Sequence, residues 1–182
     1  MKTIFYVDGY NLYYGCLKHS DYKWLDLQIL LDEQILRQQD PSSQLLHINY
    51  FTAPILAKVA SRGAQAANAQ SDYLRALQNH LKEKVRIIQG YYALEKGNLP
   101  VYKRPLDKQD RTSVWRLEEK QTDVNIALEA YRDAIKGHAD QLVFVTNDTD
   151  IAPALRMIRS DLGRLDPHRD HPAYTWRFIA AW

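Results

Sequence analysis

Four aspartates stand where a carboxylate could act in catalysis. Asp8 ends the apolar stretch that opens the chain, while Asp148 and Asp150 follow the late apolar stretch "LVFV". Asp123 is the second residue of the segment "TDVNIALEAYRDAIKG". Carboxylates that crowd together raise one another's pKa unless a cation neutralises them, and Mg²⁺ or Mn²⁺ matches such oxygen ligands. Because such an ion activates water and stabilises charge on phosphate oxygens, these residues favour phosphodiester hydrolysis.

The elements that must position these acids follow from the periodicity of the sequence. Short apolar, β-branched and aromatic runs predict strands at residues 3–7, 45–53, 85–94 and 140–146. Apolar residues at helical spacing predict helices at 23–36, 69–84, 122–137 and 151–162. The apolar stripe expected for the third helix is Val124, Ala127, Leu128, Tyr131, Ala134 and Ile135. Residues 95–120 lose this periodicity, which predicts a long loop or a small hairpin.

This alternation of strands and helices predicts one α/β domain. We expect three layers, with a mainly parallel sheet flanked by helices in a Rossmann-like arrangement. Ligands of open α/β sheets bind outside the carboxyl ends of the strands. Asp8, Asp148 and Asp150 would face that crevice, and the helix start at Asp123 would lie on the same rim.

Structural roles compete with this interpretation. An Asp after a strand is often a turn residue or a helix cap, and Asp150 stands where an N-cap would precede "IAPALRMI". Asp123 could act only as a favourable charge on a helix dipole. Asn11 could form a local turn bond, and Glu119 could be a solvated acid before a helix.

Three segments of the sequence resemble the NYN domains, a branch of the PIN-like metal-dependent ribonucleases. They are "FYVDGYNLYY", "EEKQTDVNIALEAYRDA" and "LVFVTNDTDIAPAL", and together they span Thr3 to about Arg159. The family commonly shows Ser-Gly-Asp-Ser-Asp where this chain has residues 146–150, so both acids and a hydroxyl are kept and Asn147 replaces glycine. The resemblance implies a PIN-like fold and hydrolysis of RNA with Mg²⁺ or Mn²⁺.

The resemblance also assigns roles to individual residues. It implies that the catalytic, metal-binding residues are Asp8, Asp123, Asp148 and Asp150. Asp8 and Asp148 are the expected direct ligands because strand ends are rigid, while Asp123 and Asp150 would bind a second ion or hold a metal-bound water. Asn11 accompanies Asp8 and would, like Thr146, hydrogen-bond phosphate or water.

Substrate contacts are expected around this crevice and on the segment that leads into Asp123. The predicted substrate-binding residues are Tyr10, Asn11, Lys103, Arg104, Arg116, Lys120, Thr146 and Asn147. Basic side chains follow phosphates, and aromatic rings stack on unpaired bases. Seven basic residues between Lys96 and Lys120 are offset by five acids from Glu95 to Glu119, so a merely solvated loop is the alternative.

Composition limits the remaining choices. The 182 residues, 46% of them hydrophobic, suit one globular domain, and the net charge of +2 gives no general attraction to nucleic acid. A lone cysteine, Cys16, excludes an internal disulfide. No leader precedes "TIFYVDGY" and no apolar run approaches the roughly 20 residues that span a bilayer, so we expect a cytoplasmic protein without membrane insertion.

The end of the chain does not follow the pattern of the rest. We expect a nuclease domain over residues 1–165 and an atypical or truncated tail over 166–182, because the tail is not a clean strand. Only "YTWRFIAAW" could supply an edge strand, and its pairing in the main sheet would contradict truncation. Missing elements would expose Trp176, Phe178 and Trp182 and favour a homo-oligomer.

Two other functions remain open from the sequence. One is an RNA-binding or protein-interaction module that keeps the acids without efficient turnover. The other is a phosphatase that passes through an aspartyl-phosphate, which needs an acid or hydroxyl two residues after the nucleophile. Tyr10 in that position after Asp8 disfavours the phosphatase.

Overall fold

Five parallel strands form the central sheet of the protein. The computed structural model describes the backbone of residues 1–165 and 175–179 and the side chains up to residue 161. The strands are β1 (Lys2–Asp8), β2 (Gln44–Thr52), β3 (Val85–Gln89), β6 (Gln141–Val145) and β7 (Thr175–Ile179). Their order is β3-β2-β1-β6-β7, and every neighbouring pair is parallel. The predicted α/β architecture with a mainly parallel sheet is confirmed.

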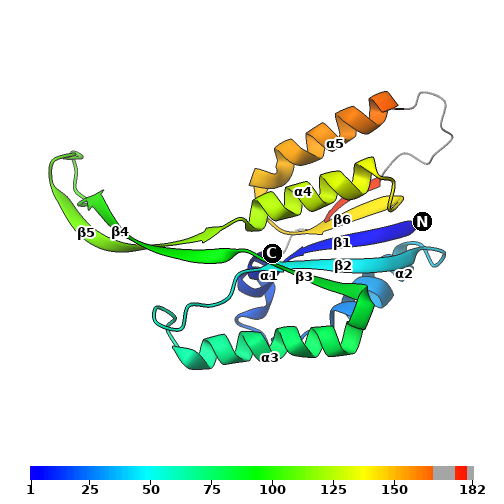
Figure 1. Cartoon of the computed structure of the whole chain (residues 1–182), viewed down its shortest axis with the longest axis horizontal. Helices are drawn as coiled ribbons and strands as arrows, with labels where there is room; N and C mark the ends of the chain where they lie inside the picture. Colours follow the sequence, from blue (N-terminus) through cyan, green and yellow to red (C-terminus); the bar gives the residue numbers. More distant parts are fainter. Residues whose placement is uncertain (166–174, 180–182) are drawn as a thin grey trace.

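Helices cover both faces of this sheet (Figure 1). One face carries α1 (Gly9–Leu12), η1 (Tyr13–Leu17), η2 (Ile29–Leu36), α2 (Arg37–Gln39), α3 (Ala64–Leu81) and η3 (Lys82–Lys84). The other carries α4 (Thr122–Ile135), η4 (Thr149–Ile151) and α5 (Ala152–Leu165). The predicted helices are therefore present, although the first is largely π-helical and the second begins earlier than its apolar pattern suggests.

The alternating side chains of β1 supply both halves of the hydrophobic core. Phe5 and Val7 belong to the cluster that includes the apolar face of α3. Ile4 and Tyr6 belong to the cluster that includes residues of α4 and α5. A strand buried on both faces has no solvent-facing side, which explains why "IFYV" is a continuous run of large apolar and aromatic residues.

The direction of the chain connections reverses between β1 and β6. The connections β1–β2 and β2–β3 pass over the face of α3, whereas the connections β3–β6 and β6–β7 use α4 and α5 on the opposite face. β1 and β6 are neighbours, paired from Thr3 with Gln141 to Val7 with Val145. Ligand sites of open parallel sheets form outside the carboxyl ends of the strands at such a point. Asp8 and Thr146 lie there.

A long hairpin projects from the sheet between β3 and α4 (Figure 1). It consists of β4 (Tyr91–Pro100) and β5 (Arg111–Lys120), which pair antiparallel along their whole length. The single strand predicted for residues 85–94 is wrong, because β3 ends at Gln89 and β4 begins at Tyr91. Gly90 separates them at a point where an added Cβ would come within 2.3 Å of the Lys120 carbonyl oxygen. Of the two alternatives for residues 95–120, the hairpin is confirmed.

Helix α4 packs with a different face than its predicted apolar stripe. The buried residues are Thr122, Ile126, Ala130, Asp133 and Ala134. Val124 and Leu128 are about 60% exposed, and Ile135 is also exposed, so the predicted stripe is wrong at these three positions. The helix carries apolar residues on two sides, and contact with β1 and β2 selects the side that contains the small alanines.

The tail contributes a strand to the sheet. Residues 175–179 form β7, which pairs in parallel with β6 from Thr175 opposite Gln141 to Ile179 opposite Val145. The expectation that the sheet lacks a strand after α5 is therefore wrong. Residues 166–174 and 180–182 lie outside the described part of the chain, as do the side chains of Trp176, Phe178 and Trp182 on which the predicted self-association depends. Among the described helices, none has the length and apolar character required to cross a membrane.

Candidate active site

Asp8 lies at the carboxyl end of β1 and is almost completely buried. Its carboxylate caps α1 by accepting a hydrogen bond from the backbone N–H of Asn11 at 3.0 Å. The Asn11 side-chain amide donates to the other carboxylate oxygen, and the Thr146 hydroxyl donates to that same oxygen at 3.4 Å. Burial raises the pKa of Asp8, while these hydrogen bonds to the charged form oppose the rise.

Thr146 and Asp148 follow β6 on the neighbouring strand. The buried Thr146 hydroxyl accepts a hydrogen bond from the Asp148 backbone N–H at 3.0 Å while it donates to Asp8. Asp148 is the N-cap of η4 and accepts from the Asp150 backbone N–H at 2.8 Å. The cap that the sequence indicated at Asp150 therefore belongs to Asp148, and Asp150 is exposed in the first turn.

Glu119 and Asp123 approach the same place from the base of the hairpin. Glu119 is half-buried at the end of β5 and accepts a hydrogen bond from the Thr122 hydroxyl. Burial raises the pKa of Glu119, the hydrogen bond from Thr122 opposes this, and the charges of Asp8 and Asp123 raise it further. The pKa of Asp123 is also raised, first by burial and then by the charges of Asp148, Asp8 and Asp150.

These side chains line one pocket of about 150 Å³. The residues around it are Asp8, Tyr10, Asn11, Glu119, Gln121, Thr122, Asp123, Val124 and Asp148. None of these described lining residues is basic, so the acids face one another without a compensating cation from the wall. In addition to burial, the charges of these neighbouring acids raise the pKa of Glu119 and Asp123.

Tyr10 forms part of the pocket wall and is held by several contacts. Its hydroxyl donates to the Ala53 carbonyl oxygen at 2.9 Å, and its ring lies edge-on to Tyr92 and stacks on Tyr14. Beyond Tyr10 and Asn11 lies a second, open pocket of about 350 Å³, lined also by Tyr14, Gly15 and Asn147. The pocket of carboxylates thus continues into a wider surface depression bordered by aromatic rings.

The comparisons with known proteins agree with this geometry. The family model of the NYN domain matches residues 2–165. The chain belongs to the NYN family. Membership implies a nuclease-like function, and NYN and PIN-like nucleases usually use divalent metals. In this NYN domain each of the three resembling segments contributes at least one acid to the pocket.

A curated relative carries a different kind of name. The chain is 44% identical over 177 residues to the 6-hydroxy-3-succinoylpyridine 3-monooxygenase HspA of Pseudomonas putida, an alignment that covers 88% of this chain and 56% of the relative. The chain therefore spans little more than half the length of that protein. No solved structure matches the chain significantly.

The NYN domain brings together many of the predicted site residues. Asp8, Asp123 and Asp148 line the pocket with Tyr10 and Asn11, and Thr146 lies beside Asp8. Asp150 does not line the pocket, although its charge raises the pKa of Asp123, and Asn147 lies in the neighbouring depression.

The predicted basic residues lie along the hairpin rather than in the pocket. Lys120 and Arg116 both form ion pairs with Glu118. Lys103 pairs with Asp107 and Asp110 at 3.1 and 3.0 Å near the hairpin tip, where Arg104 is exposed. Their contact with a substrate stays a prediction.

Sequence reasoning missed two polar residues of the pocket, Gln121 and Thr122. Gln121 adopts a left-handed backbone conformation (φ 77°) that turns the chain from β5 into α4. Thr122 then places its hydroxyl on Glu119. A hydroxyl residue immediately before Asp123 at a helix start was the available signal, because such residues often hydrogen-bond nearby polar groups. Nothing in the residue type of Gln121 indicates its conformation.

Proposed function

We propose that this NYN domain is a divalent-metal-dependent ribonuclease. The observation that carries the proposal is the convergence of Asp8, Glu119, Asp123 and Asp148 on one pocket at the switch point of the sheet. Carboxylates whose pKa is raised by burial and by neighbouring acids are stabilised by a bound cation or by protonation, and a metal-dependent hydrolase uses the first of these.

The donor set fits Mg²⁺ or Mn²⁺ in its chemistry. All the acidic pocket residues offer oxygen atoms, which these hard ions prefer. Within the described residues, no group of three or more His, Cys, Asp or Glu already has the arrangement of a metal site. Asp8, Asp123 and Asp148, with Glu119 or Asp150, would hold the ion, which supplies water activation and neutralises charge on the phosphate.

The other residues of the pocket would orient these groups. Asn11 donates two hydrogen bonds to Asp8 and Thr146 donates one, so both fix the direction of that carboxylate. Thr122 does the same for Glu119. Tyr10 would border the substrate, because its ring forms the wall between the pocket and the wider depression. Basic residues of the hairpin would hold the RNA phosphates.

The identity of 44% with a protein named a monooxygenase favours a second candidate function. A monooxygenase transfers one oxygen atom of O₂ to its substrate and reduces the other to water with two electrons from a reductant. Under this alternative, the pocket would bind 6-hydroxy-3-succinoylpyridine or a related heterocycle. We rank it second because the chain covers only 56% of that relative.

One set of assays separates these functions. Purified protein is incubated with a mixed RNA pool and Mg²⁺ or Mn²⁺, beside Asp8→Asn, Asp148→Asn and a chelated sample. Asp72→Asn is the matched control, since Asp72 is an exposed acid on α3. If chelation and both pocket variants abolish cleavage while the control variant retains it, the result supports the ribonuclease.

Cleavage that persists in both pocket variants would exclude this site as its source. A parallel assay offers 6-hydroxy-3-succinoylpyridine, O₂ and a reduced nicotinamide, and consumption of the pyridine without RNA cleavage would favour the monooxygenase. RNA binding without either reaction would indicate a binding module on the same fold.

A further inference from the structure

The register of the β4–β5 hairpin divides its side chains between two different faces. Residues opposite each other in an antiparallel pair share a face, and successive residues alternate. The pairs Tyr92–Glu119, Leu94–Leu117, Lys96–Trp115, Asn98–Ser113 and Pro100–Arg111 lie on one face, which we name the pocket face. The pairs Tyr91–Lys120, Ala93–Glu118, Glu95–Arg116, Gly97–Val114 and Leu99–Thr112 lie on the other, the opposite face.

Charges on the opposite face neutralise one another. Glu118 forms ion pairs with both Arg116 and Lys120, which flank it on the same side of β5. Glu95 stands across from Arg116 in the ladder. These basic groups therefore already have carboxylate partners, which weakens their attraction for an external phosphate.

The pocket face begins inside the candidate active site. Glu119 lines the pocket of carboxylates, and Tyr92 packs edge-on against Tyr10 in its wall. Further along the hairpin follow Leu94 opposite Leu117, and then Lys96 opposite Trp115. The side chain of Trp115 is 74% exposed, and among the described residues Lys96 forms no ion pair.

We propose that the pocket face of the hairpin binds single-stranded RNA that leads away from the pocket. Trp115 stacks on an unpaired base, and Lys96 contacts a neighbouring phosphate. Trp115 and Glu119 are four positions apart along β5, which at the usual rise of a strand is ~13 Å, a span of a few nucleotides. This inference rests on the proposed function for the nature of the ligand.

The residue types favour RNA over a second copy of the chain. An exposed indole beside an unpaired ammonium group matches a base beside a phosphate. A stable protein interface buries about 800 Å² per partner and is depleted in lysine, whereas this face of a two-stranded ribbon is narrow and carries Lys96 and Arg111. A duplex offers no free base faces, so Trp115 discriminates against it.

The test measures binding without cleavage. Full-length protein in chelator is titrated into a short labelled RNA with 2′-O-methyl groups, single-stranded or as a duplex, and fluorescence anisotropy gives Kd at several salt concentrations. Variants on the pocket face are Trp115→Ala, Trp115→Phe and Lys96→Gln, and the charge control is Arg75→Gln, at an exposed arginine of α3. Circular dichroism verifies that each variant is folded.

We expect Trp115→Ala to weaken single-strand binding about tenfold, Trp115→Phe to retain most of the affinity, and duplex binding to be unaffected. Lys96→Gln should reduce the salt dependence of Kd by about one phosphate contact, and Arg75→Gln should change little. An unchanged Kd in Trp115→Ala, no RNA binding by any form, or a larger loss in Arg75→Gln than in Lys96→Gln would overturn the inference. So would a change of oligomeric state in Trp115→Ala.

The outcome is distinguishable from failure of the proposed function. Cleavage with metal but no dependence of Kd on Trp115 would keep the ribonuclease and remove the hairpin site. Dependence of Kd on Trp115 without cleavage by any form would keep the RNA site and remove the nuclease activity.

Discussion

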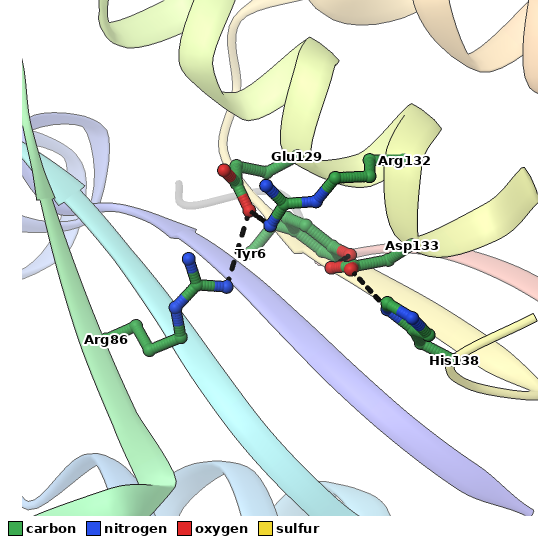
Figure 2. A network of polar contacts seen from close by, with 6 residues as sticks. All are labelled: Tyr6, Arg86, Glu129, Arg132, Asp133 and His138. Atoms are coloured by element: carbon green, nitrogen blue, oxygen red, sulfur yellow. Dashed lines mark hydrogen bonds and ion pairs between the residues drawn. The ribbon is translucent and has the colours of Figure 1, made fainter. Parts of the chain in front are cut away.

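Two groups of carboxylates in this protein differ in their partners. Beneath α4, Asp133 is buried and accepts a hydrogen bond from the Tyr6 hydroxyl at 2.7 Å, with His138 Nδ1 2.9 Å from its other oxygen. Figure 2 shows that Glu129, one turn earlier, forms ion pairs with Arg86 and Arg132. In this group, which we name the α4 network, every acid meets a donor or a cation.

The acids of the pocket have other acids as neighbours. Asp8 has hydrogen-bond donors, but burial and then the charges of neighbouring acids raise the pKa of both Glu119 and Asp123. The α4 network serves the stability of the fold, because each of its buried charges has a partner within the protein and none is left unpaired. The pocket is built at a cost in stability, which is typical of a site that awaits a ligand.

The first prediction removes a charge from the pocket. Asp8→Asn should lower RNA cleavage at least about 100-fold, because even indirect partners of a metal typically affect activity 10–100-fold. The free energy of unfolding at neutral pH should not fall, since asparagine keeps an acceptor for the Asn11 N–H and no longer buries a charge. Initial cleavage rates and denaturant unfolding measure the two effects. A destabilised Asp8→Asn would show that Asp8 is structural like Asp133.

The second prediction removes an acid from the α4 network. Asp133→Ala should lower the free energy of unfolding by about 3 kcal/mol, because the buried Tyr6 hydroxyl loses its acceptor and the site is left with a cavity. The cleavage rate of the folded fraction should stay unchanged. Adding Tyr6→Phe should recover part of the loss, since the unpaired hydroxyl is removed. Additive losses in the double variant would contradict a direct Tyr6–Asp133 interaction.

The sequence alone predicted more of the pocket than of the α4 network. Asp8 and Asp148 end apolar runs, and the rule that parallel strands present their carboxyl ends together was enough to place them near each other. Asp133 gives no such signal, because its partners Tyr6 and His138 come from other elements and its burial depends on which side of α4 meets the sheet. The sequence does not show which side of α4 packs against the sheet, because Leu128 on one side and Ile126 on the other are both apolar.

The hairpin was the part of the fold least accessible to sequence reasoning. Its residues alternate between two solvent-exposed faces, so β4 and β5 lack the apolar periodicity that identifies a half-buried strand. The register that separates Trp115 from Arg116 follows only from the pairing of the strands. The boundary at Gly90 depends on the close Lys120 carbonyl, a contact between residues distant in sequence.

The third prediction concerns pH and metal. The raised pKa values of Asp8, Glu119 and Asp123 mean that the folded state binds protons more tightly than the unfolded state. The stability that these groups contribute is therefore complete below their ordinary pKa values of 3.8 and 4.5 and is lost as pH rises through the raised values.

At neutral pH, Mg²⁺ or Mn²⁺ should restore this stability, by about 2.7 kcal/mol at a hundredfold excess over Kd. Thermal unfolding with and without metal, at neutral pH and below about pH 4, measures the difference. The metal effect should vanish at the lower pH and in Asp8→Asn. An equal stabilisation of Asp8→Asn would place the metal elsewhere.

The smallest expected effect comes from the exposed end of the α4 network. Arg86→Ala removes a partner of Glu129, but its side chain is about half exposed, the contact is 3.4 Å, and Arg132 still pairs with the same carboxylate. Surface ion pairs of this kind contribute about 0–1 kcal/mol, so the change in the free energy of unfolding should stay below about 1 kcal/mol. A loss as large as that of Asp133→Ala would mean that the network acts as one cooperative unit. Denaturant unfolding of both variants and of their combination decides between these outcomes, because only coupled residues give non-additive losses.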